Sequence, residues 1–163
     1  METLTLYTLS TLLSLIPAAC VAFRREPARD TVFWLATAVA VAGPAAWSAV
    51  LFSSAWRTGL SSTLWVTIAT CMILYGVLAA ATREVWRLAP LLVPYLTLLG
   101  IVAAVWAQAP ERPLSGQSTL AWLEAHKLIS VLTYSILTVA AVAGVAVFLQ
   151  ERAMKKRRPT RVT

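Results

Sequence analysis

Five long stretches without a charged residue dominate this sequence of 163 residues. They cover residues 3–23, 31–56, 58–82, 88–110 and 128–150, and short charged clusters separate them. Each stretch is at least as long as the roughly 20 residues that a helix needs to cross about 30 Å of hydrocarbon. A charge at mid-membrane costs roughly 2.5–3.5 kcal/mol on insertion scales. The sequence therefore predicts an all-α integral membrane bundle with five transmembrane helices.

The composition agrees with this class, since 59% of the residues are hydrophobic and 13% are charged. A membrane β-barrel is not expected, because its strands would alternate apolar and polar residues in segments of about ten. The connections between the first four stretches have at most seven residues, so consecutive spans should be antiparallel neighbours. We expect a single transmembrane domain over residues 1–163, packed as one compact bundle, with a basic tail at residues 151–163.

The basic residues lie mostly on one side of the predicted membrane. Three lie on the other side: Arg57, Arg112 and Lys127. The positive-inside rule then predicts an outer N-terminus and an inner C-terminus. This distribution accounts for the net charge of +7 without nucleic acid, since a basic tail also serves as a stop-transfer signal and contacts anionic lipid. The basic residues on the predicted inner side are Arg24, Arg25, Arg29, Arg83, Arg87, Arg152, Lys155, Lys156, Arg157, Arg158 and Arg161.

One longer connection, residues 111–127, falls on the outer side. Its first half contains Pro113, Gly116 and serines, which disfavour regular structure. Ser118 or Thr119 can then cap a helix. We expect this helix to begin in the outer interface and to continue through the fifth span, over residues 119–150.

The fifth span contains the only histidine of the chain, His126. Trp122, His126, Ser130 and Tyr134 recur every fourth residue, so they form a slowly winding stripe on one side of a helix. Polar side chains in transmembrane helices rarely face lipid, and we therefore expect the stripe to face the bundle or a cavity.

Two interpretations of this stripe stay open. In the structural one, Ser130 and Tyr134 form hydrogen bonds across helices, Trp122 belongs to an interfacial aromatic belt, and His126 is solvated at the headgroups. In the functional one, His126 is an axial ligand of haem and Trp122 packs on the macrocycle. Spacing alone favours the structural interpretation. An uneven distribution of tryptophans suits an outer aromatic pocket, since the outer half should hold Trp47, Trp56, Trp65, Trp106 and Trp122 and the inner interface Trp34 and Trp86.

Catalysis is not expected. The predicted spans contain no acidic residue, and no phosphate-binding glycine loop or hydrolase motif occurs. Cys20 and Cys71 lie in hydrophobic runs without a CxxC motif, so we interpret them as small apolar residues. We do not predict an enzyme.

The run AWLEAHKLISVLTYSILTVAAVAGVAVFLQERAMKKRRP resembles a helix of the bacterial cytochrome c assembly family of polytopic membrane proteins. The resemblance rests on Trp122, His126, Ser130 and Tyr134, followed by the Gln-Glu-Arg at residues 150–152 and the basic stretch. Earlier spans are similar in character to the N-terminal half of shorter inner-membrane relatives in that family.

The resemblance implies a bacterial inner-membrane protein that handles or presents haem at the outer face. It implies His126 as an axial ligand, with Trp122, Tyr134 and Ser130 around it. The tryptophan-rich segment and second histidine of the family are absent from these residues. Haem binding would then require a C-terminal half, a second subunit or a homodimer mate, and apocytochrome c is an implied partner. The alternative is a structural or assembly subunit of a larger membrane complex, without a cofactor.

Overall fold

The computed structural model describes residues 2–24, 28–53, 57–82, 84–109, 112–113 and 120–157. Almost all of them are helical, and the five α-helices are each long and apolar enough to cross a membrane. The predicted all-α architecture with five apolar helices is confirmed. The helices are α1 (Glu2–Ala22), α2 (Thr31–Ser53), α3 (Leu60–Ala81), α4 (Ala89–Val105) and α5 (Leu120–Arg157).

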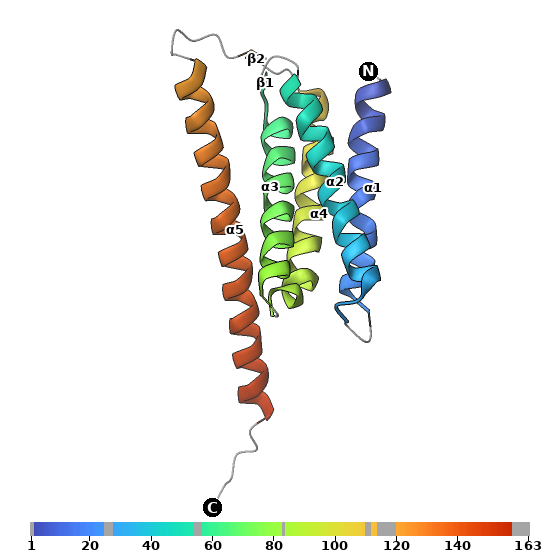
Figure 1. Ribbon diagram of the computed structural model, residues 1–163, viewed down its shortest axis with the longest axis vertical. Coiled ribbons are helices and arrows are strands. Elements are labelled where there is room, and N and C mark those ends of the chain that lie inside the picture. Colours follow the sequence, from blue (N-terminus) through green and yellow to red (C-terminus); the bar gives the residue numbers. More distant parts are fainter. Residues whose placement is uncertain are drawn as a thin grey trace, which may run out of the picture.

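Four of these helices close a ring. Helix α1 packs against α2 and α4, and α3 also packs against α2 and α4 (Figure 1). Helix α5 lies along the outer side of α3 and touches α4 only slightly (Figure 1). The five helices are thus arranged as a four-helix ring with the fifth helix packed on the outside of α3.

The core of the ring is built mainly from α3 and α4. Helix α3 has neighbours on three sides, so its large side chains are the most enclosed of the chain. Trp65, Ile68, Met72 and Tyr75 of α3 are fully or almost fully buried against Leu92 and Leu96 of α4 and Leu15 of α1. Continuous apolar sequence thus becomes a core only where helices surround it, and elsewhere the same residue types stay exposed.

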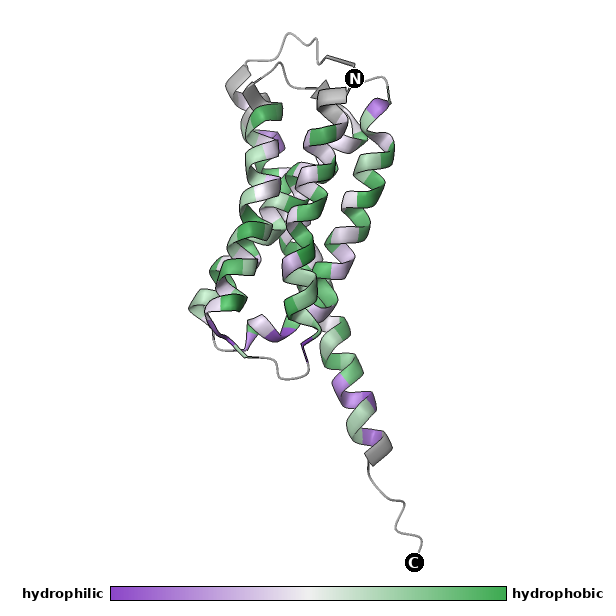
Figure 2. Ribbon diagram, turned by 90° about the vertical axis from the view of Figure 1, so that its right-hand side faces the viewer, coloured by the Kyte–Doolittle hydropathy of each residue, from purple (hydrophilic) through white to green (hydrophobic). Residues whose placement is uncertain are grey.

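The two ends of the ring differ in charge. The N-terminal end holds the start of α1 and a short antiparallel pair, in which β1 (Arg57–Thr58) pairs with β2 (Arg112–Pro113). The opposite end, called here the basic end, holds the α1–α2 connection and the turn η1 (Val85–Leu88) before α4. Polar residues gather at this basic end in Figure 2.

Several predicted boundaries shift by a few residues. Helix α2 ends at Ser53, and residues 57–58 pair as β1 with β2. The sequence predicts residue 57 in the connection between spans two and three, and residue 58 in span three. Span four divides into η1, α4 and the turn η2 (Trp106–Gln108). These changes occur where each helix reaches the end of the ring and its neighbours stop covering it.

Helix α5 is the longest element, with 38 residues. At 1.5 Å per residue it extends for about 57 Å, nearly twice the thickness of a hydrocarbon core. It continues seven residues past the predicted limit of 150, so the tail begins as helix. Figure 2 shows this part of α5 projecting beyond the basic end, and Glu151, Arg152 and Lys155 are exposed on it. Residues 158–163 lie outside the described part of the chain.

Candidate functional site

The stripe on α5 points away from the ring. Trp122 is 72% exposed and Tyr134 is 65% exposed. His126 between them is also exposed, and Ser130 is half-buried. The structure therefore brings the four sequence-predicted residues onto one side of α5, but the expectation that this side faces the other helices is wrong for the described chain.

The opposite side of α5 packs on α3. Ser135 is fully buried there, and Val139 is almost so. Ser135 follows His126 by nine residues, which at 100° per residue places the two side chains about 180° apart on the helix. Cys71 of α3 approaches Ser135, with its Sγ 3.9 Å from the Ser135 carbonyl oxygen. This contact settles which side of α5 meets the ring.

The hydroxyl groups of Ser130 and of the adjacent Thr133 are satisfied within α5 itself. Ser130 Oγ donates a hydrogen bond to the His126 carbonyl oxygen at 2.8 Å, and Thr133 Oγ1 donates to the Ile129 carbonyl oxygen at 2.8 Å. The hydrogen bond across helices that the structural interpretation expects of Ser130 is therefore not formed by the described residues. Among the described residues, the His126 imidazole and the Tyr134 hydroxyl have no hydrogen-bond partner.

The tryptophans of the N-terminal end do not gather around His126. Trp47 of α2 stacks on Tyr7 of α1, with ring centroids 5.5 Å apart. Trp65 is buried inside the ring, and Trp122 stands exposed on α5. The expected aromatic pocket is therefore not formed by the described part of the chain. Trp56, assigned to the same end, lies outside the described residues.

No metal centre is assembled within the described chain. The described residues contain no group of three or more His, Cys, Asp or Glu side chains that could hold a metal ion. Cys20 is exposed and Cys71 is buried, and both are free thiols. His126 can thus offer one imidazole nitrogen to an iron, and any second protein ligand has to come from elsewhere.

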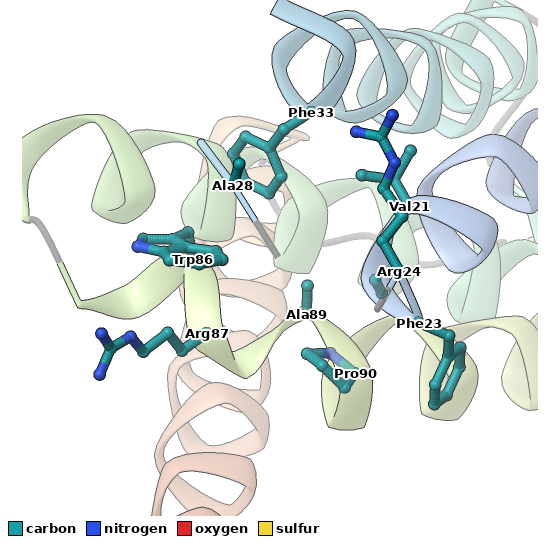
Figure 3. A pocket seen from close by; sticks show the side chains of 10 residues that line it. Val21, Phe23, Arg24, Ala28, Phe33, Trp86, Arg87, Ala89 and Pro90 are labelled. Carbon is teal, nitrogen blue, oxygen red and sulfur yellow. The ribbon is translucent and has the colours of Figure 1, made fainter. Parts of the chain in front are cut away.

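A second feature, which the sequence reasoning missed, is a hollow of about 570 Å³ at the basic end. It lies between the end of α1, the start of α2 and the η1–α4 segment (Figure 3). Its wall combines apolar side chains with arginine, and includes Val21, Arg24, Phe33, Trp86, Arg87 and Pro90. In the sequence, these arginines indicate only the orientation in the membrane, and Trp86 only an inner interface. Nothing in their spacing shows that the three segments that contain them meet in space.

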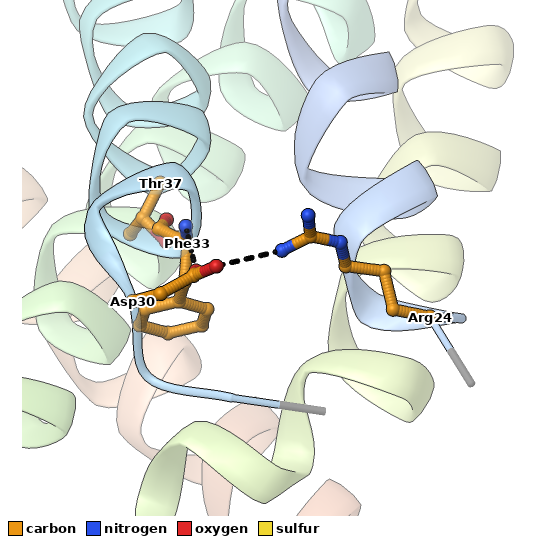
Figure 4. A network of polar contacts seen from close by, with 4 residues as sticks. All are labelled: Arg24, Asp30, Phe33 and Thr37. Atoms are coloured by element: carbon orange, nitrogen blue, oxygen red, sulfur yellow. Dashed lines mark hydrogen bonds and ion pairs between the residues drawn. The ribbon is translucent and has the colours of Figure 1, made fainter. Parts of the chain in front are cut away.

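The Arg24 side of the hollow is held by a polar network that also starts α2 (Figure 4). Asp30 Oδ2 accepts a hydrogen bond from Arg24 Nη1 at 3.0 Å, and Asp30 Oδ1 accepts one from the Phe33 backbone N–H at 2.9 Å. Asp30 thereby caps α2, because the first N–H groups of a helix have no partner within it. The Phe33 N–H and the Arg24 guanidinium lower the pKa of the Asp30 carboxyl.

Aromatic packing holds the opposite side. The Phe33 and Trp86 rings meet edge to face, with centroids 6.2 Å apart. Tyr75 of α3 donates a hydrogen bond from its hydroxyl to the Trp86 carbonyl oxygen at 3.1 Å. Arg29 reaches the Ala80 carbonyl oxygen at 3.3 Å and lies over the Trp34 ring, 4.9 Å from its centroid. These contacts fix the connections that surround the hollow.

Comparison with known proteins gives one informative likeness. No protein-family model matches the chain, and no solved structure matches it. The chain is 44% identical over 162 residues to a protein of Azospirillum brasilense described as an uncharacterized 28.8 kDa protein in a nifR3-like 5′ region. The match covers 96% of this chain and 60% of that relative. The chain thus spans about three fifths of the relative's length.

Proposed function

We propose that the protein is a multi-pass component of the bacterial inner membrane, with the N-terminal end of the ring outside and the basic end inside. Five helices of sufficient length and apolarity support insertion. The orientation is supported by Arg24, Arg29 and Arg87 at the basic end, together with the basic residues on the projecting part of α5. In this orientation the α5 stripe begins at the outer surface.

Its function, in this proposal, is to handle or present haem at the outer face, with His126 as one axial ligand. The observation that carries the proposal is an accessible imidazole without a hydrogen-bond partner among the described residues, on a side of α5 that no other described helix covers. A neutral imidazole nitrogen is a common haem ligand, and bound haem would supply redox-active iron.

The neighbours of His126 suit a flat apolar ligand with polar edges. Trp122 lies about one turn toward the outer surface, and Tyr134 lies about 12 Å deeper along the helix axis. Both are exposed on the same side of α5. Ser130 directs its hydroxyl to the His126 carbonyl, so it stabilises the helix beneath the imidazole and does not compete for it.

The described residues fit one half of such a site. A bound haem group would need protein contacts on its other face and, for six-coordinate iron, a second axial ligand. A partner subunit, a second copy or additional chain would have to supply both. We propose binding and presentation, with apocytochrome c as the recipient, and no bond-making step by this chain.

A structural or assembly subunit without a cofactor is the alternative, and the exposed side of α5 also favours it. Gly144 has no atom within 4 Å of the position where a Cβ would stand, so a partner helix could approach α5 closely there. This alternative predicts that His126 is dispensable and that Gly144→Leu disrupts association.

The test is to purify the protein from haem-replete membranes and to record reduced difference spectra of the wild type, His126→Gly and a matched control. Gln150→Ala is the control, because Gln150 is also exposed on α5 but lies far from His126. We expect haem in the wild type and the control, its loss in His126→Gly, and recovery when imidazole is added to that variant. Equal haem in all three proteins, or none in the wild type even when the missing half of the site is supplied, would contradict the proposal.

A further inference from the structure

The hollow at the basic end is open to the outside and narrows toward the core. A cavity of only about 10 Å³, lined by Ala36, Tyr75 and Val93 among others, shares Val21, Phe33 and Ala89 with it. That space holds at most about one water molecule. Any larger ligand must therefore stay at the rim, between the ends of α1, α2 and α4.

The lining of the hollow is amphipathic. Val21, Ala89 and Pro90 offer apolar surface, Phe33 and Trp86 offer aromatic rings, and Arg24 offers a guanidinium (Figure 3). Planar guanidinium groups suit phosphate because their N–H donors match pairs of phosphate oxygens. A ligand with an anionic phosphate next to an apolar portion complements this combination.

Arg24 has hydrogen-bond donors beyond those that its described ion pair uses. Its described ion pair with Asp30 uses one Nη1 hydrogen bond, whereas a guanidinium has five N–H donors. Arg87 forms a similar single contact with Glu84 at 3.2 Å, and its side chain is 64% exposed, so it has room to turn toward the hollow. Two arginines from different segments thus line the same hollow.

The position of the hollow along the ring indicates that a bound phosphate would belong to a lipid headgroup. It lies where the apolar helices α1, α2 and α4 end, at the level of Trp34 and Trp86. Tryptophan at this level is typical of the membrane interface, and the inner leaflet of a membrane carries anionic headgroups. A phospholipid in that leaflet can place its phosphate at the rim and keep its acyl chains in the bilayer.

We propose that this hollow is a binding site for the phosphate group of an anionic phospholipid, held by Arg24 and Arg87 against the Phe33–Trp86 wall. The site rests on the insertion and orientation of the ring proposed above, and it does not depend on haem or on His126. Binding there would tie the α1–α2 connection to the start of α4.

The experiment measures how phosphatidylglycerol stabilises the detergent-solubilised full chain against heat, with phosphatidylcholine as the neutral lipid. Arg24→Gln/Arg87→Gln is the test variant. Arg152→Gln/Lys155→Gln is the matched control, because it removes the same charge from the projecting part of α5. A direct hydrogen bond to a charged phosphate contributes about tenfold to binding, so we expect roughly 100-fold weaker phosphatidylglycerol binding in the test variant and a much smaller change in the control, whose side chains do not line the hollow.

A second variant covers the case in which the test variant does not fold. Ala28→Trp would fill the hollow from an exposed position and keep both arginines, and it should also abolish the specific stabilisation. Glycerol 3-phosphate in place of the lipid distinguishes the source: a weak effect supports a lipid, and an effect equal to that of phosphatidylglycerol would overturn the lipid assignment.

Equal phosphatidylglycerol binding by the wild type, the test variant and Ala28→Trp would overturn the site itself, and so would an equal loss in the Arg152→Gln/Lys155→Gln control. Haem spectra of the same preparations report separately on α5. A failure at this hollow is therefore distinguishable from a failure of the proposed haem function.

Discussion

The packing of α1 against α2 offers a quantitative test of the fold. Gly43 of α2 lies directly against Ser14 of α1. A Cβ added at Gly43 would stand 2.6 Å from Ser14 Cβ and would overlap Ser14 Oγ. Ordinary contact begins at 3.4 Å, so α1 and α2 would have to separate by 3.4 − 2.6 = 0.8 Å. Rotation of the serine hydroxyl cannot relieve this, because the Ser14 Cβ is fixed to the backbone.

We therefore expect Gly43→Ala to destabilise the protein relative to Gly144→Ala. Both changes bring the same helix-propensity gain of about 1 kcal/mol, which cancels in the comparison. Overpacking costs roughly 1–3 kcal/mol, and Gly144 has nothing within 4 Å of its added Cβ. Alanine at position 43 would also crowd the ring of Pro44. For a chain of this size the difference corresponds to a melting temperature lower by roughly 2–12 °C.

Circular dichroism at 222 nm during heating in detergent would measure this difference. Combining Gly43→Ala with Ser14→Gly should relieve the overlap, whereas combining it with Ser14→Ala should not, because alanine keeps the Cβ. Equal melting temperatures for Gly43→Ala and Gly144→Ala would refute the described α1–α2 packing.

Three further predictions concern polar groups. Tyr75→Phe removes the hydrogen bond to the Trp86 carbonyl oxygen, Ser61→Ala removes the one to the Ala103 carbonyl oxygen, and each change should cost about 1 kcal/mol in the same melting assay. Asp30→Ala should lower the melting temperature at neutral pH. Because the native pKa of Asp30 is lowered, its contribution is complete above the unfolded pKa of about 3.9 and is lost as the pH falls through the native pKa, so wild type and variant should converge in a pH series toward pH 3. His126→Ala should change stability by less than about 0.5 kcal/mol, since the imidazole is exposed, and a larger loss would argue for a structural role.

Sequence reasoning predicted the helices well because their signal is local. Charge-free runs of sufficient length follow from the cost of placing a charge in hydrocarbon, and no tertiary contact is needed to recognise them. The same reasoning missed the short strand pair at Arg57–Thr58, where a connection and the start of span three were predicted. The residues paired there are 56 and 54 positions apart in the sequence, and a local pattern cannot show such a pairing.

The orientation of α5 could not be predicted in this way. The rule that polar residues avoid lipid pointed the His126 side inward, but both sides of α5 contain hydroxyl residues, and Ser135 is the one that is buried. Ser130 and Thr133 bond to the carbonyls of their own helix, which reduces the cost of exposing them. The hollow at the basic end was missed for a related reason, since Arg24, Phe33 and Trp86 meet only after four helices have packed.

Cysteine accessibility in intact cells would test most directly whether His126 stands at the outer surface, on the uncovered side of α5. The background would be Cys20→Ala/Cys71→Ala, and His126→Cys would be compared with Ala28→Cys at the basic end. A membrane-impermeant maleimide should label His126→Cys in intact cells and Ala28→Cys only after permeabilisation. Labelling of Ala28→Cys alone in intact cells would contradict the orientation, and a His126→Cys that stays unlabelled after permeabilisation would contradict its exposure.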